Sequence, residues 1–415
     1  MTEVRVVAQS AAAASRRLSS ISTDAKNALL LGVASQVEAT RDAILAANLL
    51  DMRAARDAGL PIAKLRRLEV TSASLTQAIA GVREIAALPD PVGQVTSDIT
   101  RPNGLRVRRV RTSLGVIAMI FEARPLVTLD AFALCFKSGN ACILKGGKEA
   151  ARTAGVIAGC IRQALAEHAL PVDAVAAAND WSREQVAQLV ALEGLIDLAI
   201  PRGGPELIAF VRQRAKVPCI FHAAGVCHVY IDESADEAMA ANIVLNGKTS
   251  APATCNATEC VLVHAAIAAR VLPQLAERLT QAGVRVHADE RAQPYMPGAA
   301  AATSADWGRE YLDLEIAVRV VDSLDDAIAH IAAYSSDHTE AIVTKNPAVA
   351  AEFVQRVRSS CTVVNASTRF NDGFQLGLGA EVGISTSRLH AYGPMGLEEL
   401  TTTRFVVDGE GQIRQ

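Results

Sequence analysis

One cysteine stands in a stretch of small residues that could admit a substrate. The stretch SAPATCNATECVLVH runs from Ser250 to His264, and a strand-like apolar run begins only after Glu259. A cysteine with bulky apolar neighbours would fill core space, whereas Cys255 has small neighbours and a lysine seven residues before it. A thiolate in such a loop needs only a nearby positive charge or main-chain N–H groups to act as a nucleophile. The residues alone leave two roles open for Cys255, nucleophile and small buried hydrophobe.

Two glycine pairs could hold a nucleotide. The stretches ILKGGKEAA (143–151) and AIPRGGPEL (199–207) each read as a strand, a basic residue, Gly-Gly and a helix. Glycine lets the main chain approach a phosphate, and a helix N-terminus offers free N–H groups and the positive end of the helix dipole. Neither stretch is a GxGxxG motif, and a tight strand-to-helix turn can contain Gly-Gly without any ligand. The sequence contains no Walker loop or GxSxG elbow.

The eight cysteines do not indicate a zinc site or a disulfide framework. None of them forms a CxxC pair, and a reducing cytosol would keep them as thiols. Cys227 and His228 lie close to His222 in the sequence, but VPCIFH and GVCHVYID both read as strands. We therefore expect no metal site.

Bulk composition predicts a cytoplasmic chain of two or three domains. The 415 residues are half apolar with few aromatics, and the net charge is −3. This charge gives no reason to expect nucleic acid or an anionic membrane as a partner. The N-terminus lacks the apolar core of a signal peptide, and no run reaches the roughly 18 apolar residues of a membrane helix.

Two sets of alternating strands and helices must position these residues. The first ninety residues read as helices, with Thr23 and Thr71 as N-caps. From about 140 to 222, and again after 225, apolar strands alternate with helices, which is typical of parallel sheets covered on both faces. Between these regions, GLRVRRVR (104–111) alternates apolar residues with arginines, which predicts a solvated edge strand or an oligomer contact. We expect two α/β domains that meet near 223–250.

These stretches together resemble one family along almost the whole chain. The resemblance rests on RPNGLRVRRVRTSLGVIAMIFEARPLVTLDAFALCFKSGN (101–140), both glycine turns, CHVYID, the cysteine loop and the block from VNASTRF to TTTRFVV (364–407). The chain is similar to the γ-glutamyl phosphate reductases, a branch of the aldehyde dehydrogenase superfamily. The resemblance implies NADPH-dependent reduction of L-glutamyl 5-phosphate to L-glutamate 5-semialdehyde through a cysteine thioester, with release of phosphate. This is the second step of proline biosynthesis from glutamate.

The resemblance also implies an α/β fold of the aldehyde dehydrogenase type. A Rossmann-type domain (1–97 and 118–225) would bind NADPH, and an α/β domain (226–391) would carry the catalytic cysteine. Bridging strands (98–117 and 392–411) would form a small β element, and because superfamily members join subunits through such strands we expect a homo-oligomer. The chain has no kinase domain, so a separate glutamate 5-kinase must supply the acyl phosphate. Direct transfer between the two enzymes is a hypothesis.

Roles for single residues around the thiol follow from the same resemblance. Cys255 is the catalytic thiolate, and a main-chain N–H beside it or the Asn256 side chain would stabilise the oxyanion. Arg124 suits phosphate because its guanidinium fork matches phosphate oxygens, and a structural ion pair is the alternative. Arg369 would bind the substrate α-carboxylate. His222 stands where hydrolytic aldehyde dehydrogenases carry a general-base glutamate, which favours phosphate over water as the partner of the thioester.

The implied cofactor residues lie in the two glycine turns and in one later segment. Lys145 would contact the adenosine ribose, and Lys148 replaces the glutamate of NAD-using relatives and would attract the 2′-phosphate of NADPH. Glu310 would hold the nicotinamide ribose, with an exposed helix-end carboxylate as the alternative. The full set is Lys145, Gly146, Gly147, Lys148, Arg202, Gly203, Gly204 and Glu310.

Three departures from the family pattern concern substrate binding. Ala224 replaces the aspartate of HLDG, Ala251 replaces an arginine, and Tyr392 replaces the arginine of HARGP. These changes remove charges that could hold a dianionic substrate or its ammonium group, but they leave the reaction type unchanged. The alternative functions are a hydrolytic aldehyde dehydrogenase and a non-enzymatic relative kept for assembly or binding.

Overall fold

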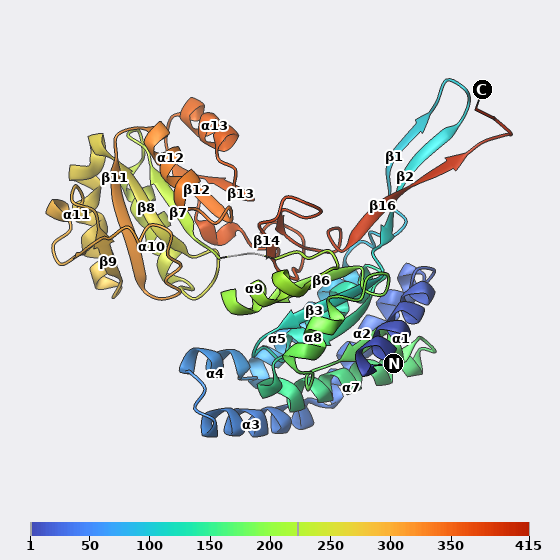
Figure 1. The fold of residues 1–415 in the computed structure, drawn as a ribbon. Helices are drawn as coiled ribbons and strands as arrows, with labels where there is room; N and C mark the ends of the chain where they lie inside the picture. Colours follow the sequence, from blue (N-terminus) through green and yellow to red (C-terminus); the bar gives the residue numbers. More distant parts are fainter. Residues whose placement is uncertain (1, 222–223, 415) are drawn as a thin grey trace. The chain divides into compact units, whose positions relative to one another are not determined.

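The computed structural model describes residues 2–221 and 224–414, and the chain divides into two compact units (Figure 1). The first unit comprises Met1–Phe221, Leu378–Gly383 and Met395–Gln415. The second comprises His222–Gly377 and Ile384–Pro394. Among the described helices, none combines the length and the apolar character needed to cross a membrane.

A four-stranded parallel sheet forms the centre of the first unit. Its order is β5-β4-β3-β6, formed by Val175–Ala177, Ala141–Lys145, Val116–Phe121 and Leu198–Arg202. β3 is buried at every residue, because helices cover both faces of such a sheet. The predicted alternation of strands and helices is therefore confirmed here. The prediction of a strand over VPCIFH is wrong: Cys219 forms only an isolated bridge with Ala199, since Pro218 has no N–H for a continuous ladder.

Helices surround this sheet. The structure confirms Thr71 as the N-cap of α5, where it forms a capping box with Ser74, whereas Ser22 rather than Thr23 caps α2. The helices of this unit are α1 (Glu3–Leu18), α2 (Thr23–Ala39), α3 (Arg41–Asp57), α4 (Ile62–Leu68), α5 (Ser72–Ala87), α6 (Val127–Lys137), α7 (Ala151–Glu167), α8 (Arg183–Leu189) and α9 (Pro205–Arg214), with short 3₁₀ turns at Lys148–Ala150 and Val172–Ala174.

The arginine-rich stretch lies in a separate antiparallel sheet of the first unit. β1 (Val95–Thr100), β2 (Arg106–Ser113) and β16 (Thr401–Asp408) pair in the order β1-β2-β16, so segments from both ends of the chain lie side by side (Figure 1). β2 is therefore the middle strand, and the prediction of an edge strand is wrong because β16 covers its second edge. Carboxylates on the flanking segments pair with its arginines, as Asp98 does with Arg106 at 2.6 Å.

A seven-stranded parallel sheet forms the second unit. Its order is β10-β9-β11-β8-β7-β12-β13. The strands are β7 (Cys227–Ile231), β8 (Thr258–His264), β9 (Arg285–Ala288), β10 (Ala300–Ala301), β11 (Glu315–Val321), β12 (Thr339–Val343) and β13 (Cys361–Val364), with a separate pair β14 (Ile384–Ser385) and β15 (Gly393–Pro394). The helices are α10 (Glu237–Thr249), α11 (Ala265–Gln281), α12 (Leu324–Tyr334) and α13 (Pro347–Arg356), with 3₁₀ turns at Gln293–Tyr295 and Thr368–Phe370.

Alternate residues of each strand face opposite layers of this unit. Val261 and Val263 of β8 pack with residues of α10 and α11, whereas Cys260 and Leu262 pack with residues of α12 and α13. This period of two is the one expected of strands buried on both faces.

A buried ion pair closes the base of the loop between α10 and β8. Lys248 Nζ lies 2.6 Å from Glu259 Oε2, and both side chains are fully buried. Lys248 also donates to the carbonyl of Asp313 at 3.1 Å, and the N–H of Leu312 donates to Glu259 Oε1 at 3.4 Å. Burial raises the pKa of Glu259 to about 7, although Lys248 opposes this shift. The pair joins both ends of the loop to the segment before β11.

We predict that Lys248→Met lowers the free energy of unfolding by roughly 3–5 kcal/mol, because it leaves a buried carboxyl group without its partner. The double substitution Lys248→Met/Glu259→Leu should recover much of this loss. Arg270→Met, which breaks the exposed pair with Glu237, is the control and should cost less than about 1 kcal/mol. Urea unfolding measures all three, and equal small losses for Lys248→Met and Arg270→Met would contradict the prediction.

Candidate active site

Cys255 lies half-buried in the loop that the Lys248–Glu259 pair closes. The loop passes so close to Gly225 that a Cβ there would lie 2.0 Å from the Cys255 carbonyl oxygen, so only glycine fits. The buried thiol of Cys227, at the start of β7, donates to the same carbonyl at 3.2 Å. These contacts hold the main chain at Cys255 in one position.

The Asn256 side chain forms hydrogen bonds within the fold, which leaves it unavailable to a reacting group. It is buried, and its Nδ2 donates to the carbonyls of Asn371 at 3.0 Å and Arg369 at 3.4 Å. Its Oδ1 accepts from Thr254 at 3.0 Å. The main-chain N–H of Asn256, by contrast, has no acceptor among the described residues. Of the two expected oxyanion donors, the geometry therefore favours the main chain.

Arg369 and Glu310 are distant from Cys255 in sequence, but both lie near the cysteine loop. Arg369 is half-buried, and its guanidinium donates to the hydroxyl of Thr254, the residue before Cys255, at 2.7 Å. The carboxylate of Glu310 accepts from the N–H of Gly225 at 2.9 Å. The second unit thus brings together a thiol, a cation and a carboxylate that the sequence places 55 to 114 residues apart.

Both glycine turns lie at the same edge of the first unit's sheet. β4 and β6 each pair with β3, so the carboxyl ends of these three parallel strands meet. This edge is where open α/β sheets bind ligands. Lys145 ends β4, Lys148 follows it in an exposed position, and Arg202 ends β6. The resemblance and the topology therefore point to the same edge.

Internal packing explains several of the glycines in these turns. The Gly146 N–H donates to Asn179 Oδ1 at 2.9 Å, and a Cβ at Gly147 would lie 2.2 Å from Glu149. A Cβ at Gly203 would lie 2.8 Å from Leu207, whereas Gly204 faces open space. The glycines alone are thus no proof of a nucleotide.

The basic side chains carry the electrostatic argument for a nucleotide at this edge. Glu149 and Glu122 place carboxylates against the two turns, so any affinity for anions depends on Lys145, Lys148 and Arg202. Burial lowers the pKa of Lys145, whose Nζ donates to the Gly146 carbonyl at 2.6 Å. Asp180 also lies near Lys145. Lys148, by contrast, is exposed and has no ion-pair partner in the described part of the chain, so the turn that carries it fits an anionic dinucleotide.

The loop after β3 carries Arg124. Its side chain is exposed and lines a cleft of about 300 Å³ together with Arg67 and Asp130. Burial raises the pKa of Asp130 to about 6, with Arg202 opposing the shift. Glu69 also lines the cleft, and two guanidinium groups beside two carboxyl groups suit a substrate that carries both negative and positive charge. Arg202 itself donates to the carbonyl of Val382, so part of its hydrogen-bonding capacity is used within the first unit.

One predicted substrate residue, His222, lies outside the described residues. Of the three departures from the family pattern, Tyr392 is tied down by a hydrogen bond from its hydroxyl to the carbonyl of Arg358 and by Arg388 over its ring. Ala224 and Ala251 are half-buried; the first lies just before β7, and the second lies in the cysteine loop itself.

Sequence reasoning missed the residues that hold the site together. Gly225 and Cys227 contact the Cys255 carbonyl, and Glu259 pairs with Lys248. A signal for the pair was present, because a lysine and a glutamate interrupt otherwise apolar elements at the two ends of one short loop. No comparable signal marks Cys227, which resembles any buried cysteine.

Comparisons with known proteins agree with this geometry. The aldehyde dehydrogenase family model matches residues 1–306. A γ-glutamyl phosphate reductase of Xanthomonas campestris is 52% identical over 97% of both chains, and one of Thermobifida fusca is 50% identical over 99% of both. The crystal structure of the Thermotoga maritima γ-glutamyl phosphate reductase covers both chains completely, with a TM-score of 0.97 and 41% identity. The chain thus belongs to the γ-glutamyl phosphate reductase branch of the aldehyde dehydrogenase family.

Proposed function

We propose that this chain reduces L-glutamyl 5-phosphate to L-glutamate 5-semialdehyde and releases phosphate, with NADPH as the reductant and a thioester at Cys255. It is an oxidoreductase of proline biosynthesis. Full-length identity to γ-glutamyl phosphate reductases supports the reaction type. The observation that carries the chemistry is the half-buried thiol of Cys255 beside the N–H of Asn256, which has no acceptor in residues 2–221 and 224–414, with Arg369 donating to Thr254.

The cysteine acts first as a nucleophile and then as a leaving group. The Cys255 thiolate attacks the acyl carbonyl, and phosphate leaves readily because an acyl phosphate is a mixed anhydride. The Asn256 N–H donates to the oxygen that becomes negative, and the neighbouring guanidinium of Arg369 holds the substrate α-carboxylate. A thioester carbonyl accepts hydride, whereas a free carboxylate does not. The resulting thiohemiacetal collapses to the aldehyde and restores the thiolate.

Family membership gives a nicotinamide cofactor, and we propose that it is NADPH. The cofactor supplies the hydride. Lys145, Lys148 and Arg202 would hold its phosphates, and Glu310 would bind a ribose hydroxyl. Lys148 is exposed and has no ion-pair partner among the described residues, which leaves its charge available for a 2′-phosphate.

Other parts of the proposal concern assembly and supply of substrate. We place the enzyme in the cytoplasm and expect it to receive acyl phosphate from glutamate 5-kinase, with direct contact between the two as a prediction. We also propose that the three-stranded sheet joins copies of the chain. Ile99, Val107 and Val407 are paired across its strands and therefore share one face, where Ile99 is 53% and Val407 54% exposed.

The reverse reaction tests the thioester mechanism. With NADP⁺ and the semialdehyde, we expect NADPH absorbance to rise only when inorganic phosphate is present, because phosphate must cleave the thioester. Cys255→Ser should lower the rate by roughly 10³-fold or more, and Cys361→Ser should leave it unchanged. NADPH formation without phosphate would show that water cleaves the thioester, making the enzyme a hydrolytic dehydrogenase.

Charge reversal at Lys148 tests the choice of cofactor. We expect Lys148→Glu to lower kcat/KM for NADPH by about 10–100-fold, the value of a hydrogen bond to a charged group. The kcat/KM for NADH should stay within a few-fold. Lys216→Glu, on the same unit, is the control for net charge. Equal losses with both cofactors would argue against a contact with the 2′-phosphate.

A charge on the exposed sheet tests assembly. Phe405 of β16 is 69% exposed, and Phe405→Lys should shift the sedimentation coefficient toward that of a single chain. Phe374→Lys, at a 60% exposed phenylalanine in the second unit, is the matched control and should keep the assembly intact. A wild-type chain that sediments as a monomer would refute the oligomer.

A further inference from the structure

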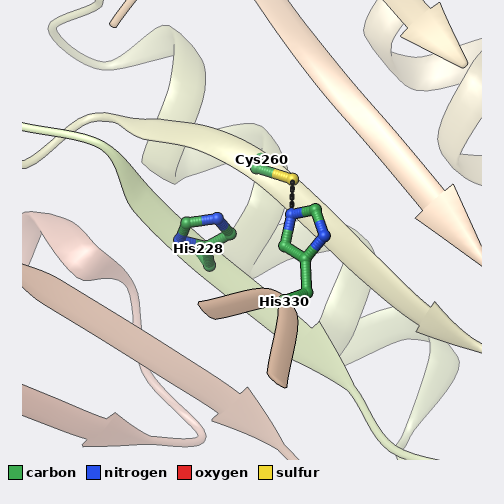
Figure 2. Close-up of side chains that lie close together, drawn as sticks. All are labelled: His228, Cys260 and His330. Carbon is green, nitrogen blue, oxygen red and sulfur yellow. Dashed lines mark hydrogen bonds between the residues drawn. The ribbon is translucent and has the colours of Figure 1, made fainter. Parts of the chain in front are cut away.

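A buried cluster of two histidines and a cysteine has no role in the proposed reaction. His228 of β7 and Cys260 of β8 are direct cross-strand partners, and His330 of α12 lies over them (Figure 2). One ring nitrogen of each histidine and the cysteine sulfur lie within 4.8 Å of one another. The three side chains are at most 4% exposed, and Trp307 and Ile331 are among the apolar residues around them. No local pattern in the sequence predicts this cluster, because its members come from three elements.

One side of the cluster contains a carboxylate that orients His228. Glu340 Oε2 lies 3.0 Å from His228 Nδ1 and also accepts the His228 N–H at 2.9 Å. Its other oxygen accepts from the hydroxyls of Ser335 and Ser359. Two hydroxyls and one main-chain N–H donate to Glu340, so the carboxylate is an acceptor toward the cluster. Nδ1–H of His228 therefore donates to Glu340, which leaves Nε2 facing the cluster, and Nε2 has no hydrogen-bond partner among the described residues.

The other side contains a cation that orients His330. Arg319 donates to His330 Nδ1 at 2.8 Å, so the proton of the neutral ring is on Nε2. Nε2 lies 3.7 Å from Cys260 Sγ and donates to it (Figure 2). Because Arg319 can only donate, Nδ1 of His330 is an acceptor, and the ring is the neutral tautomer with its proton on Nε2.

The cluster is built to hold one positive charge between Cys260 Sγ and His228 Nε2. The charges of Glu340 and Arg319 cancel, so a thiolate at Cys260 requires one further cation. A proton supplies this charge, and a soft metal ion could replace it one for one.

We propose that Cys260 Sγ and His228 Nε2 bind a soft monovalent d¹⁰ cation, Cu⁺, while His330 donates its Nε2–H to the sulfur. The cation enters as one proton leaves, so the net charge stays the same and no redox step occurs. Every hydrogen bond described for Glu340 and Arg319 remains in place. This inference is independent of the proposed reductase activity.

Charge and coordination favour Cu⁺ over Zn²⁺. Thiolate sulfur selects Cu⁺, and zinc sites also contain thiolates, but a divalent ion would leave an uncompensated charge in a buried site. Zinc also takes four ligands, whereas His330 is held as a donor by Arg319 and only two ligand atoms remain. Bonds of about 2.3 Å to sulfur and about 2.0 Å to nitrogen, the values for zinc, span about 4.3 Å in a line. The ligand atoms lie within 4.8 Å of one another, so the side chains need to move by at most about 0.5 Å to hold one ion.

A carboxylate outside the ligand pair orients His228, and a surface cleft reaches His330. A carboxylate that accepts from the second nitrogen of a ligating histidine is the usual support of metal-bound imidazole, and Glu340 supplies it. Arg319 and His330 line a surface cleft of about 380 Å³, which also borders Asp322 and Asp326. Arg291 lines the same cleft and pairs with Asp322, so Asp326 is the remaining carboxylate on the side from which His330 is reached.

The test is a titration of reduced Cys255→Ser protein with Cu⁺ in competition with bicinchoninate, without oxygen. The Cys255→Ser background removes the half-buried thiol of the proposed active site. We expect one equivalent of Cu⁺ to be bound, and X-ray absorption should show one sulfur and one nitrogen ligand. Adding Cys260→Ser should abolish this binding. His330→Gln should weaken it by roughly 10–100-fold, as loss of a supporting hydrogen bond does.

Substitution of other cysteines distinguishes Cu⁺ bound at Cys260 from Cu⁺ bound at other thiols. Cys142→Ser removes a buried thiol of the first unit, Cys361→Ser a half-buried thiol of the second, and neither should change the affinity. Binding that persists in the Cys260→Ser protein, two sulfur ligands in the absorption spectrum, tighter binding of Zn²⁺ or no binding at all would each overturn the proposal. If Cys260→Ser does not fold, the ligand set in the Cys255→Ser protein decides the matter.

Discussion

The loop that carries Cys255 depends on the buried pair of Lys248 and Glu259. Two charged groups without solvent are stable only when each finds its partner and further hydrogen bonds, and here the main chain at 312–313 supplies them. The pair thereby fixes where α10 ends, where β8 begins and where the segment behind the loop runs. Small residues can then occupy the loop itself, because the fold does not need their side chains for packing.

Close main-chain contacts at Cys255 restrict the loop further than the ion pair alone. Gly225 lies against the Cys255 carbonyl because it has no Cβ, and Cys227 donates to that same oxygen. With the carbonyl occupied in this way and the Asn256 side chain turned toward Asn371, the N–H of Asn256 is the donor that the geometry leaves available. A loop whose small residues suggest flexibility is therefore fixed by the ion pair, by Gly225 and Cys227, and by the Asn256 side chain.

Parallel strand pairing explains how both units gather distant residues. The carboxyl ends of β3, β4 and β6 meet at one edge, which brings Lys145 and Arg202 into the same region of the first unit. In the second unit, the register of β7 and β8 sets His228 directly beside Cys260, and α12 adds His330. The register is strict because a shift by one residue would expose the apolar set of either strand.

The sequence by itself determined the fold class, most of the strands and the small residues that surround Cys255. Continuous apolar runs such as VIAMIF and CVLVH predicted buried parallel strands, and small residues around Cys255 predicted an open loop. Neighbouring residues suffice to predict these features, because apolar periodicity and turn residues determine a strand or a loop within a few positions of the chain. Family resemblance added the reaction and the roles of Arg369 and Glu310.

Only the tertiary structure decided which partners these residues meet. It placed β2 in the middle of its sheet, engaged the Asn256 amide elsewhere, paired Lys248 with Glu259 and assembled His228, Cys260 and His330. Each of these outcomes depends on strand order, register or helix packing between segments far apart in the chain. Such contacts leave at most an isolated polar residue in an apolar element, as at Lys248 and Glu259, and its partner stays unknown until distant segments pack together.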